Sequence, residues 1–429
     1  MTQKRFIGSW RRLSMNLPLN HNIPTIMHID LNSCFATVEQ QAYPNLRGRP
    51  IIIAAYTTPG GCVLAPSIEA KRYGIKTGMS VRDAKLLCSE VIVRDPDPVM
   101  VRHVHLLFRN VLHNYSPYIV PKSIDELVID FTDTLALKRG LVEIGQEIKR
   151  QIRKEVGEWI SCNVGIATNR FLAKLAASLH KPDGLDVITH KNLQTVLATR
   201  TLIDLNGINT RFQARLNASG IFTPLEFLQA SSDVLQHQVF KSTCGYHWYL
   251  RLRGWEVDAL QFDRKSYGQS YALGRQTNDP KELSRLLMKL CEKMGRRLRS
   301  SCNRAYGIHI SCVYKDLTYW HMGRTFSTSL YTTQELFAKA LLLLNRQPQW
   351  KIVRELAVSC YHLTATQPEQ IELFAAAKEK SYIVQKAVDK INDKWGEFVV
   401  TPALMMGMKD TILDRIAFGQ TKELADIYK

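Results

Sequence analysis

The sequence of 429 residues has little that could build a metal or disulfide scaffold from cysteine. Its nine cysteines are scattered singly, with no CxxC pair, and no two histidines are separated by three to five residues. These absences argue against a zinc site or a disulfide framework and fit a reducing cytosol. No run approaches 18 apolar residues, so we expect no membrane-spanning helix.

A secretion signal and repetitive sequence are also missing. The start, MTQKRFIGSWRRLSMNLPLN, is basic but has no apolar core of a signal peptide. We therefore expect a loose basic extension over residues 1–22 and a cytoplasmic protein. There is no internal repeat and no low-complexity tract. The length suggests about three domains, and 45% hydrophobic with 22% charged residues is typical of a globular chain.

Acidic residues are too few to balance the basic ones. The chain has 57 Lys and Arg against 39 Asp and Glu, a formal charge of +18 and a pI near 9.5. This excess favours a polyanionic partner, with nucleic acid ahead of a membrane surface; colloidal solubility alone is the alternative. Residues 264–365 carry 17 Lys and Arg and 6 Asp and Glu, a net charge of +11 out of the total of +18. This region is therefore the candidate nucleic-acid-binding domain.

Strand and helix patterns alternate through the first half of the chain. This order predicts an α+β or α/β core with helices packed on one face of a sheet. Short helices follow over about 200–260, and a second mixed domain comes after a polar linker. Residues 366–429 mix both charges and are predicted to be an appendage. The expected core strands are 25–30, 123–131 and 160–168, and the expected helices are 98–115, 141–156 and 169–184.

Two adjacent carboxylates interrupt a stretch that otherwise predicts a buried strand, SIDELVIDFTD at 123–133. Neighbouring strand residues point to opposite faces, so Asp125 and Glu126 converge only if the chain bends sharply next to Asp125. Buried unpaired carboxylates are costly, so water or a cation must reach them. With Asp30 at another strand end they form an oxygen-only set that suits Mg²⁺. Two such ions could clamp both oxygens of a phosphoryl displacement.

Lysines and a helix start provide candidate phosphate contacts. Lys174 and Lys181 lie seven residues apart on one predicted helical run, about two turns, and should share a face. That face could hold a triphosphate, with backbone N–H groups from residues 32–34 and with Lys71 from a loop region. Asn32 or Ser33 could cap the helix that starts there. The alternative is an ordinary solvated face.

Four motifs together resemble the Y-family of DNA polymerases, in its bacterial DNA polymerase IV branch. They are HIDLNSCFATVEQ, CVLAPSIEAKRYGIKTGM, SIDELVIDFTD and VGIATNRFLAKLAASLHKPDG, in this order and spacing. The resemblance covers roughly residues 25–365. It implies an α+β multidomain right hand with a βαββαβ-like palm, small fingers, a helical thumb and a mixed α/β little finger. The implied bounds are palm 23–41 and 98–188, fingers 42–97, thumb 189–262, linker 263–270 and little finger 271–365.

The resemblance also implies a reaction and its partners. It implies a template-directed DNA polymerase of the translesion type, acting on primer-template DNA with deoxynucleoside triphosphates. We expect a nucleoid-associated monomer. Asp30, Asp125 and Glu126 would be side-chain ligands of two Mg²⁺ ions, with the Leu31 carbonyl as a backbone ligand. Two alternatives stay open, a non-catalytic recruitment scaffold and a two-metal phosphodiesterase.

Three further residues acquire roles from the resemblance. Phe35 falls at the steric gate, a ring that excludes a 2′-hydroxyl; without the flanking motif it would be an ordinary core phenylalanine. Lys181 matches the triphosphate lysine, and Lys174 would be a structural or active-site cation of the palm. The hairpin LNGINTRFQARLNASGI resembles the helix-hairpin-helix of the thumb, whose backbone amides would contact a DNA phosphate.

The sequence departs from the family pattern at several positions. Asn32 replaces a second Asp, which is not among the family's metal ligands, so we expect the chemistry to survive. Ile68 and Lys71 replace a Tyr and an Arg that touch the triphosphate, so one hydroxyl donor and a bidentate fork are lost. Asn209 stands in a GIN turn where GIG is common, which weakens the expected phosphate contact of the thumb.

A short motif near the C-terminus resembles a sliding-clamp-binding peptide. In EQIELFAAA, at 369–377, Gln370, Leu373 and Phe374 would anchor in a pocket of the clamp. The alternative is the start of an ordinary amphipathic helix.

Overall fold

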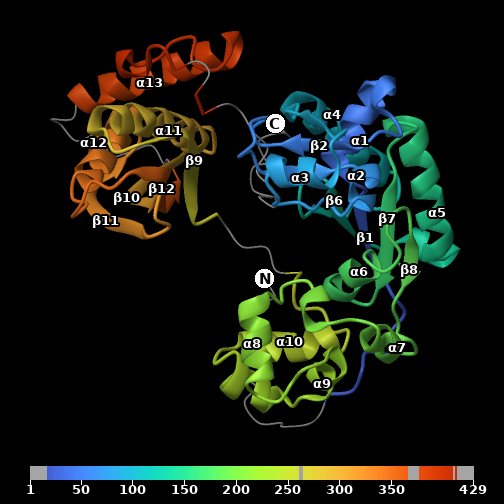
Figure 1. The fold of residues 1–429 in the computed structure, drawn as a ribbon. Coiled ribbons are helices and arrows are strands. Elements are labelled where there is room, and N and C mark those ends of the chain that lie inside the picture. Colours follow the sequence, from blue (N-terminus) through green and yellow to red (C-terminus); the bar gives the residue numbers. More distant parts are fainter. Residues whose placement is uncertain (1–16, 260–263, 366–375, 409–410, 413–429) are drawn as a thin grey trace. The chain divides into compact units, whose positions relative to one another are not determined.

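The protein is described from a computed structural model, which places residues 17–259, 264–365, 376–408 and 411–412 (Figure 1). The chain divides into two compact units, one within residues 1–261 and one within residues 262–414. No helix among the placed residues is long and apolar enough to cross a membrane.

The region predicted as the palm contains a five-stranded sheet in the order β5-β6-β1-β7-β8. Its central strand β1 is buried along its whole length, because it pairs antiparallel with both β6 and β7. Strand β8 adds to β7 in parallel. The strands are β1 (Ile26–Leu31), β5 (Ile119–Pro121), β6 (Glu126–Asp130), β7 (Cys162–Ala167) and β8 (Leu185–Val187).

Helices cover both faces of this sheet, so the prediction of helices on one face is wrong. Helices α4 and α5 share an apolar cluster with Met27 and Ile29 of β1, whereas α6 packs with Ile26 and Val128 on the opposite face. The approach of α6 requires Gly165, because a Cβ there would lie 2.0 Å from the Ala173 carbonyl oxygen. The helical elements are α1 (Cys34–Ala42), α4 (Pro98–His113), η2 (Leu135–Arg139), α5 (Leu141–Gln151), η3 (Ile152–Val156) and α6 (Arg170–Ala176).

A small three-stranded sheet, order β3-β2-β4, lies within the residues predicted as fingers. Ser67 caps α2 by accepting a bond from the Ala70 backbone N–H at 3.2 Å. The chain turns after this helix at Gly74, whose φ of +83° favours glycine. The elements are η1 (Pro44–Leu46), β2 (Ile51–Ala54), β3 (Val63–Pro66), α2 (Ile68–Arg72), α3 (Val81–Leu87) and β4 (Ile92–Arg94).

Short helices build the predicted thumb around the aromatic side chains of Phe227, Phe240 and Trp248. Residues 17–22 were predicted to belong to a loose extension, but Leu17 and Asn20 bind this region. The Leu17 N–H donates to the Tyr249 hydroxyl at 2.7 Å, and the Asn20 side chain donates to a backbone carbonyl at 3.0 Å. The elements are α7 (Leu193–Ala198), η4 (Leu202–Asp204), α8 (Thr210–Asn217), α9 (Pro224–Gln229), η5 (Val234–Val239) and α10 (Cys244–Leu252).

The second unit is a four-stranded sheet, order β11-β10-β12-β9, with two helices packed on one face. The predicted linker 263–270 is wrong from Ser266 onward, because β9 starts there and pairs with β12. Its Ser and Gly residues alternate with Tyr267 and Tyr271, which face the core. The elements are β9 (Ser266–Thr277), α11 (Pro280–Ser300), β10 (Asn303–Tyr314), β11 (Tyr319–Leu330), α12 (Thr333–Leu344) and β12 (Val353–Ala365).

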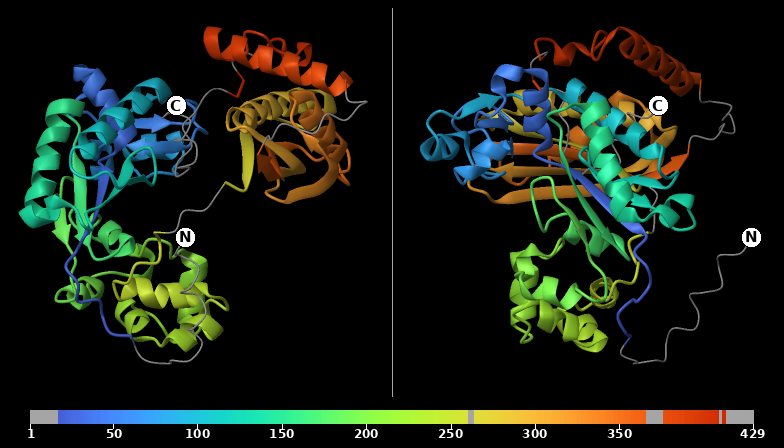
Figure 2. Two further views of the ribbon diagram at one scale, coloured as in Figure 1. Left: turned by 180° about the vertical axis from the view of Figure 1, so that it is seen from behind. Right: turned by 90° about the vertical axis from the view of Figure 1, so that its right-hand side faces the viewer.

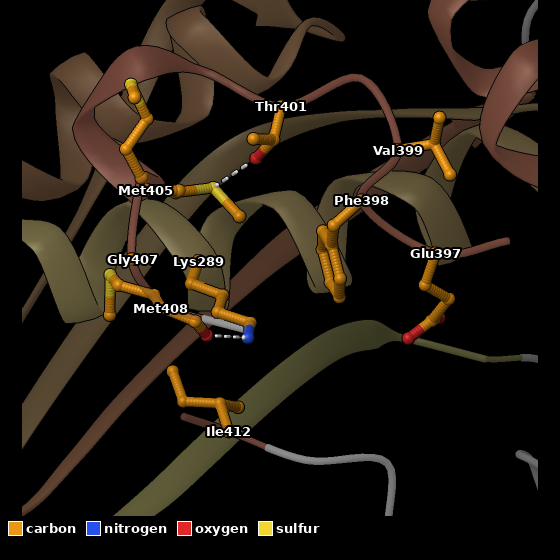
Figure 3. Close-up of a pocket in the computed structure, with 10 residues that line it drawn as sticks. Lys289, Glu397, Phe398, Val399, Thr401, Met405, Gly407, Met408 and Ile412 are labelled. Atoms are coloured by element: carbon orange, nitrogen blue, oxygen red, sulfur yellow. Dashed lines mark hydrogen bonds between the residues drawn. The ribbon is translucent and has the colours of Figure 1, made fainter. Parts of the chain in front are cut away.

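The placed part of the C-terminal region is docked on α11 and is not the appendage we predicted (Figure 2). It consists of α13 (Ala376–Trp395), η6 (Ala403–Met405) and the adjoining loops. Lys289 of α11 is 2% exposed and donates to the Met408 carbonyl at 2.6 Å, beside an apolar cavity of about 500 Å³ (Figure 3). A row of basic residues on α11 therefore binds the C-terminal region: Arg285, Lys289, Lys293, Arg296 and Arg299.

The buried ion pair of this interface is expected to support the second unit. Arg299 is 6% exposed and binds both carboxylate oxygens of Asp389, at 2.5 and 2.8 Å. Asp389→Ala leaves a buried cation without its carboxylate and is expected to lower the free energy of unfolding by about 3 kcal/mol. Asp393→Ala is the matched control, since that carboxylate is 68% exposed and its loss should cost at most about 1 kcal/mol. Urea denaturation of both variants tests the difference; equal losses would contradict it.

Candidate active site

Two of the predicted carboxylates face each other across the centre of the palm sheet. Asp30 at the end of β1 pairs in register with Glu126 at the start of β6. Directly opposed residues of an antiparallel pair project on the same face. Both strands therefore bring a carboxylate to one end of the sheet, on the face that α6 covers.

The third carboxylate, Asp125, lies in a sharp bend, as the sequence predicts. Residues 122–125 form bends between β5 and β6, and the N–H groups of Lys122 and Ser123 both donate to the Glu126 carbonyl. The Asp125 carbonyl in turn accepts from the Leu31 N–H at 3.0 Å. Asp125 lies outside the regular strand, so its side chain does not have to point to the face opposite to that of Glu126.

Lysines face two of these carboxylates. The Lys174 ammonium donates to Glu126 Oε2 at 2.6 Å, and the Lys181 ammonium binds Asp30 Oδ2. The prediction that both lysines share one helical run is wrong, because α6 ends at Ala176 and Lys181 follows a turn. Pro182 then keeps Lys181 out of helical geometry, since the residue before a proline disfavours it. The turn still brings Lys181 to the carboxylates.

Electrostatic coupling extends the cluster to Lys71 and Asp125. Burial and the neighbouring Lys181 lower the pKa of Lys71, and Asp30 opposes this shift. Burial, together with the charges of Asp30 and Glu126, raises the pKa of Asp125 to about 6, although a hydrogen bond from Ser123 opposes the shift. The predicted residues Asp30, Asp125, Glu126, Lys71, Lys174 and Lys181 thus form one charged cluster.

Asp125 is expected to lower the stability of the metal-free protein at neutral pH. Its pKa of about 6 in the folded protein lies above the ordinary value of 3.8, so ionising Asp125 lowers the free energy of unfolding. This loss is absent below pH 3.8 and reaches its full size above pH 6. Asp125→Asn should therefore stabilise the protein in EDTA by up to about 3 kcal/mol at pH 8 and by much less at pH 5. Denaturation at both pH values tests this. Asp130→Asn, at the far end of β6, is the control for losing one negative charge.

Asn32, the departure from the family pattern, has a structural role in this site. Its amide donates to the Ser161 hydroxyl at 3.0 Å and its side-chain oxygen accepts from Asn163 at 2.5 Å. Its backbone N–H donates to the Ser161 carbonyl, so it is not available to a phosphate as we had predicted. The prediction of a side-chain cap on α1 is also wrong, because Ser33 sits at φ 49° without a capping bond. Asn32 instead ties β1 to β7.

Phe35 and Ile68 differ in exposure. Phe35, in the first turn of α1, is 2% exposed and belongs to the core of the palm. The preceding residue, Cys34, senses the carboxylates directly: burial first, then the charges of Asp125 and Asp30, raise the pKa of its thiol. Ile68, at the start of α2, is half-buried. The first turn of α1 therefore borders the carboxylates.

Sequence reasoning missed two polar residues of the site, His28 and Ser123. His28 is 2% exposed, and its Nε2 lies 3.7 Å from Glu126 Oε2, while neither ring nitrogen has a hydrogen-bond partner. Burial and Lys174 lower its pKa to about 3, so the ring is neutral. The Ser123 hydroxyl binds Asp125. Two features of the sequence could have indicated these residues. His28 lies two residues before Asp30 and therefore on the same face of the strand, and Ser123 begins the motif SIDE that contains Asp125 and Glu126.

The chemistry of the donor set fits hard divalent cations. Asp30, Asp125 and Glu126 offer only oxygen, and their mutual repulsion would be relieved by positive charge. Among the placed residues, however, no three His, Cys, Asp or Glu side chains are gathered as a metal site, and Lys174 and Lys181 bind two of the carboxylates. A cation at Asp30 and Glu126 would have to displace these ammonium groups. The fold and this cluster define a palm of the polymerase type.

Comparisons with known proteins place the chain in a family. Residues 29–178 match the impB/mucB/samB family, and residues 264–373 match the C-terminal domain of that family. The curated relatives of Pelotomaculum thermopropionicum and Moorella thermoacetica, both named DNA polymerase IV, are 30% and 32% identical. The matches cover 91% and 89% of this chain and 97% and 96% of theirs. The chain belongs to the impB/mucB/samB family, the Y-family of DNA polymerases, which confirms the resemblance seen in the motifs.

A solved structure shows the same fold. A Y-family DNA polymerase chimera of Dbh and Dpo4 is similar with a TM-score of 0.70 at 24% identity, covering 79% of this chain and 99% of the chimera. This likeness confirms the predicted α+β right-hand architecture. The predicted clamp-binding residues Gln370, Leu373 and Phe374 lie outside the residues that the structure describes.

Proposed function

We propose that this protein is a template-directed DNA polymerase that adds deoxynucleotides to a primer 3′-hydroxyl, in translesion synthesis. The observation that carries the proposal is the cluster at the end of the palm sheet, where Asp30, Asp125 and Glu126 face Lys174 and Lys181. The relatives named DNA polymerase IV, matched over nearly their whole length, support it.

The three carboxylates would hold two Mg²⁺ ions, with the Leu31 carbonyl as a further ligand. Such ions activate the primer hydroxyl and neutralise the departing pyrophosphate. Register fixes Asp30 opposite Glu126, and the bend next to Glu126 carries Asp125, so the ligands would come from hydrogen-bonded backbone. The neutral ring of His28 lies 3.7 Å from Glu126 Oε2 and adds no positive charge of its own to the site.

Three lysines would bind the triphosphate. Lys181 and Lys174 would leave the carboxylates and bind phosphate oxygens once metal ions supply the positive charge next to those carboxylates. Lys71 would approach the triphosphate from the fingers. Lysine binds phosphate as a point charge and lacks the bidentate fork of arginine, so Lys71 would hold the nucleotide less rigidly than the family's usual Arg. The half-buried Ile68 cannot donate the hydroxyl bond of the usual Tyr.

Phe35 would act as the steric gate against ribonucleotides. The first turn of α1 borders the carboxylates, which supports this role. The ring is packed in the palm core and cannot easily yield to an added 2′-hydroxyl, because protein interiors tolerate little extra volume.

The remaining regions would grip the DNA. The region 189–262 would contact a phosphate through its hairpin turn at Gly207, which adopts φ +99°. The sheet domain after it would contact the duplex backbone. Because the basic row of α11 is already bound to the C-terminal region, those contacts would come from other basic residues. Residues 370–374 would bind a sliding clamp; the start of an ordinary helix is the alternative.

Single-nucleotide insertion tests the proposal. The purified protein is incubated with a primer-template, one deoxynucleoside triphosphate at a time, with Mg²⁺ or with EDTA. A polymerase inserts only the templated nucleotide, and only with Mg²⁺. Folded protein that binds DNA but inserts nothing would support the recruitment scaffold, and metal-dependent loss of nucleotides from the DNA would support the phosphodiesterase.

A further inference from the structure

Helix α13 carries its polar side chains toward the protein. Asp389 and Asp393 bind Arg299 and Arg296 of α11, and the Gln385 side chain accepts from the Thr333 N–H at 3.1 Å. Asn392 is 1% exposed and exchanges two bonds of 2.9 Å with the Val400 backbone. This inner face binds the rest of the second unit mainly through ion pairs and hydrogen bonds, where a surface helix ordinarily uses apolar contacts.

A second face of α13, beside this inner face, is apolar and exposed. Val384 is 61% exposed, Ile391 40% and Trp395 68%, and Val388 between them is half-buried. These four positions are spaced by four, three and four residues, the pattern of a coiled-coil seam. They form a stripe, hereafter the α13 seam, which the placed residues leave mostly exposed, and Ile383, 62% exposed, lies beyond it.

The charges beside the α13 seam have one sign. Over residues 380–395 both acidic side chains are bound to α11, whereas the lysines are exposed. These lysines are Lys380, Lys386, Lys390 and Lys394. On a helical wheel Lys380 and Lys394 flank the seam on one side, where the e or g positions of a coiled coil set the choice of partner.

We propose that the α13 seam docks an acidic amphipathic helix of a partner protein. The lysine flank is complementary to Glu or Asp at the facing positions of such a helix. An antiparallel pair with a second copy would bring the two lysine flanks together, which disfavours that arrangement. The proposal is independent of the polymerase activity.

Peptide binding tests the proposal. Two fluorescein-labelled 28-residue heptad peptides share Leu and Ile at a and d and differ only in Glu or Lys at e and g. The full-length protein should raise the anisotropy of the Glu peptide at micromolar concentration and bind the Lys peptide at least about tenfold more weakly. A Val384→Ser/Ile391→Ser variant should lose Glu-peptide binding at least about tenfold at unchanged thermal stability, because it leaves the contacts with α11 intact. Ile203→Ser, at a 52%-exposed site in the thumb, should bind as the wild type does.

Four outcomes would overturn the proposal. Equal binding of both peptides would remove the charge argument, and undiminished binding by the seam variant would place the contact elsewhere. Light scattering that shows a dimer dependent on Val384 and Ile391 would assign the seam to a second copy. Flotation with phosphatidylglycerol vesicles that depends on the same residues would assign it to a membrane surface.

Discussion

Replacing Asp125 and Glu126 together by alanine should lower the rate of nucleotide insertion by at least about 10³-fold. The double variant removes two of the three carboxylates that would hold Mg²⁺, and metal charge contributes several kcal/mol to phosphoryl transfer. Primer extension under single-turnover conditions measures the effect. Insertion at the wild-type rate would contradict the assignment of these carboxylates.

The control for this experiment lies on the same strand. Asp130 ends β6 and accepts from the Thr132 N–H at 2.9 Å, at the end of the strand opposite to Glu126. Asp130→Ala should insert nucleotides within a few-fold of the wild type. Both variants should retain primer-template binding, because the carboxylates do not contact DNA phosphates in this account. Loss of DNA binding in the double variant would point to misfolding.

Phe35→Ala should raise the incorporation of ribonucleotides relative to deoxynucleotides by about 5- to 150-fold. The range corresponds to the 1–3 kcal/mol that forcing an extra group against a packed side chain costs. The ratio of insertion efficiencies for a matched ribonucleotide and deoxynucleotide measures it. A ratio that does not change would place the gate at another residue.

The same substitution also creates a cavity, which requires its own control. Phe35 is 2% exposed, so its truncation should cost about 3–5 kcal/mol of stability. Phe108→Ala empties a comparable volume in the same core, on α4 and outside the first turn of α1. It should destabilise the protein similarly and leave the ratio of ribonucleotide to deoxynucleotide insertion unchanged. Insertion ratios do not depend on the fraction of active protein.

The acidic site could be predicted from sequence because local rules conflicted there. Asp125 beside Glu126 violates strand alternation, and only a bend resolves the conflict, which the hairpin between β5 and β6 supplies. The position of Lys181 was predicted for a wrong reason. The turn after Ala176 and Pro182 carry it to Asp30, where a continued helix had been expected. The contact depends on tertiary structure, which periodicity does not encode.

The C-terminal region shows what pattern reasoning misses. The apolar periodicity of α13 indicates that one face of the helix is apolar, but it does not show which face packs against the protein. Ion pairs with α11 determine the orientation of this helix. The excess charge of residues 264–365 is predicted to bind nucleic acid, yet a row of it binds the C-terminal region, with Arg299 on Asp389 and Arg296 on Asp393. His28 left no signal beyond its strand face, because a lone histidine in an apolar strand is usually a core residue. The neutral, unpartnered ring became visible only with its neighbours in place.

Anomalous diffraction from manganese tests the central claim most directly. The protein is crystallised with primer-template DNA, a non-hydrolysable deoxynucleotide and Mn²⁺ in place of Mg²⁺. We predict two manganese peaks coordinated by Asp30, Asp125 and Glu126, with Lys174 and Lys181 withdrawn from the carboxylates they bind here. A bound nucleotide with no manganese among these three carboxylates would contradict the account.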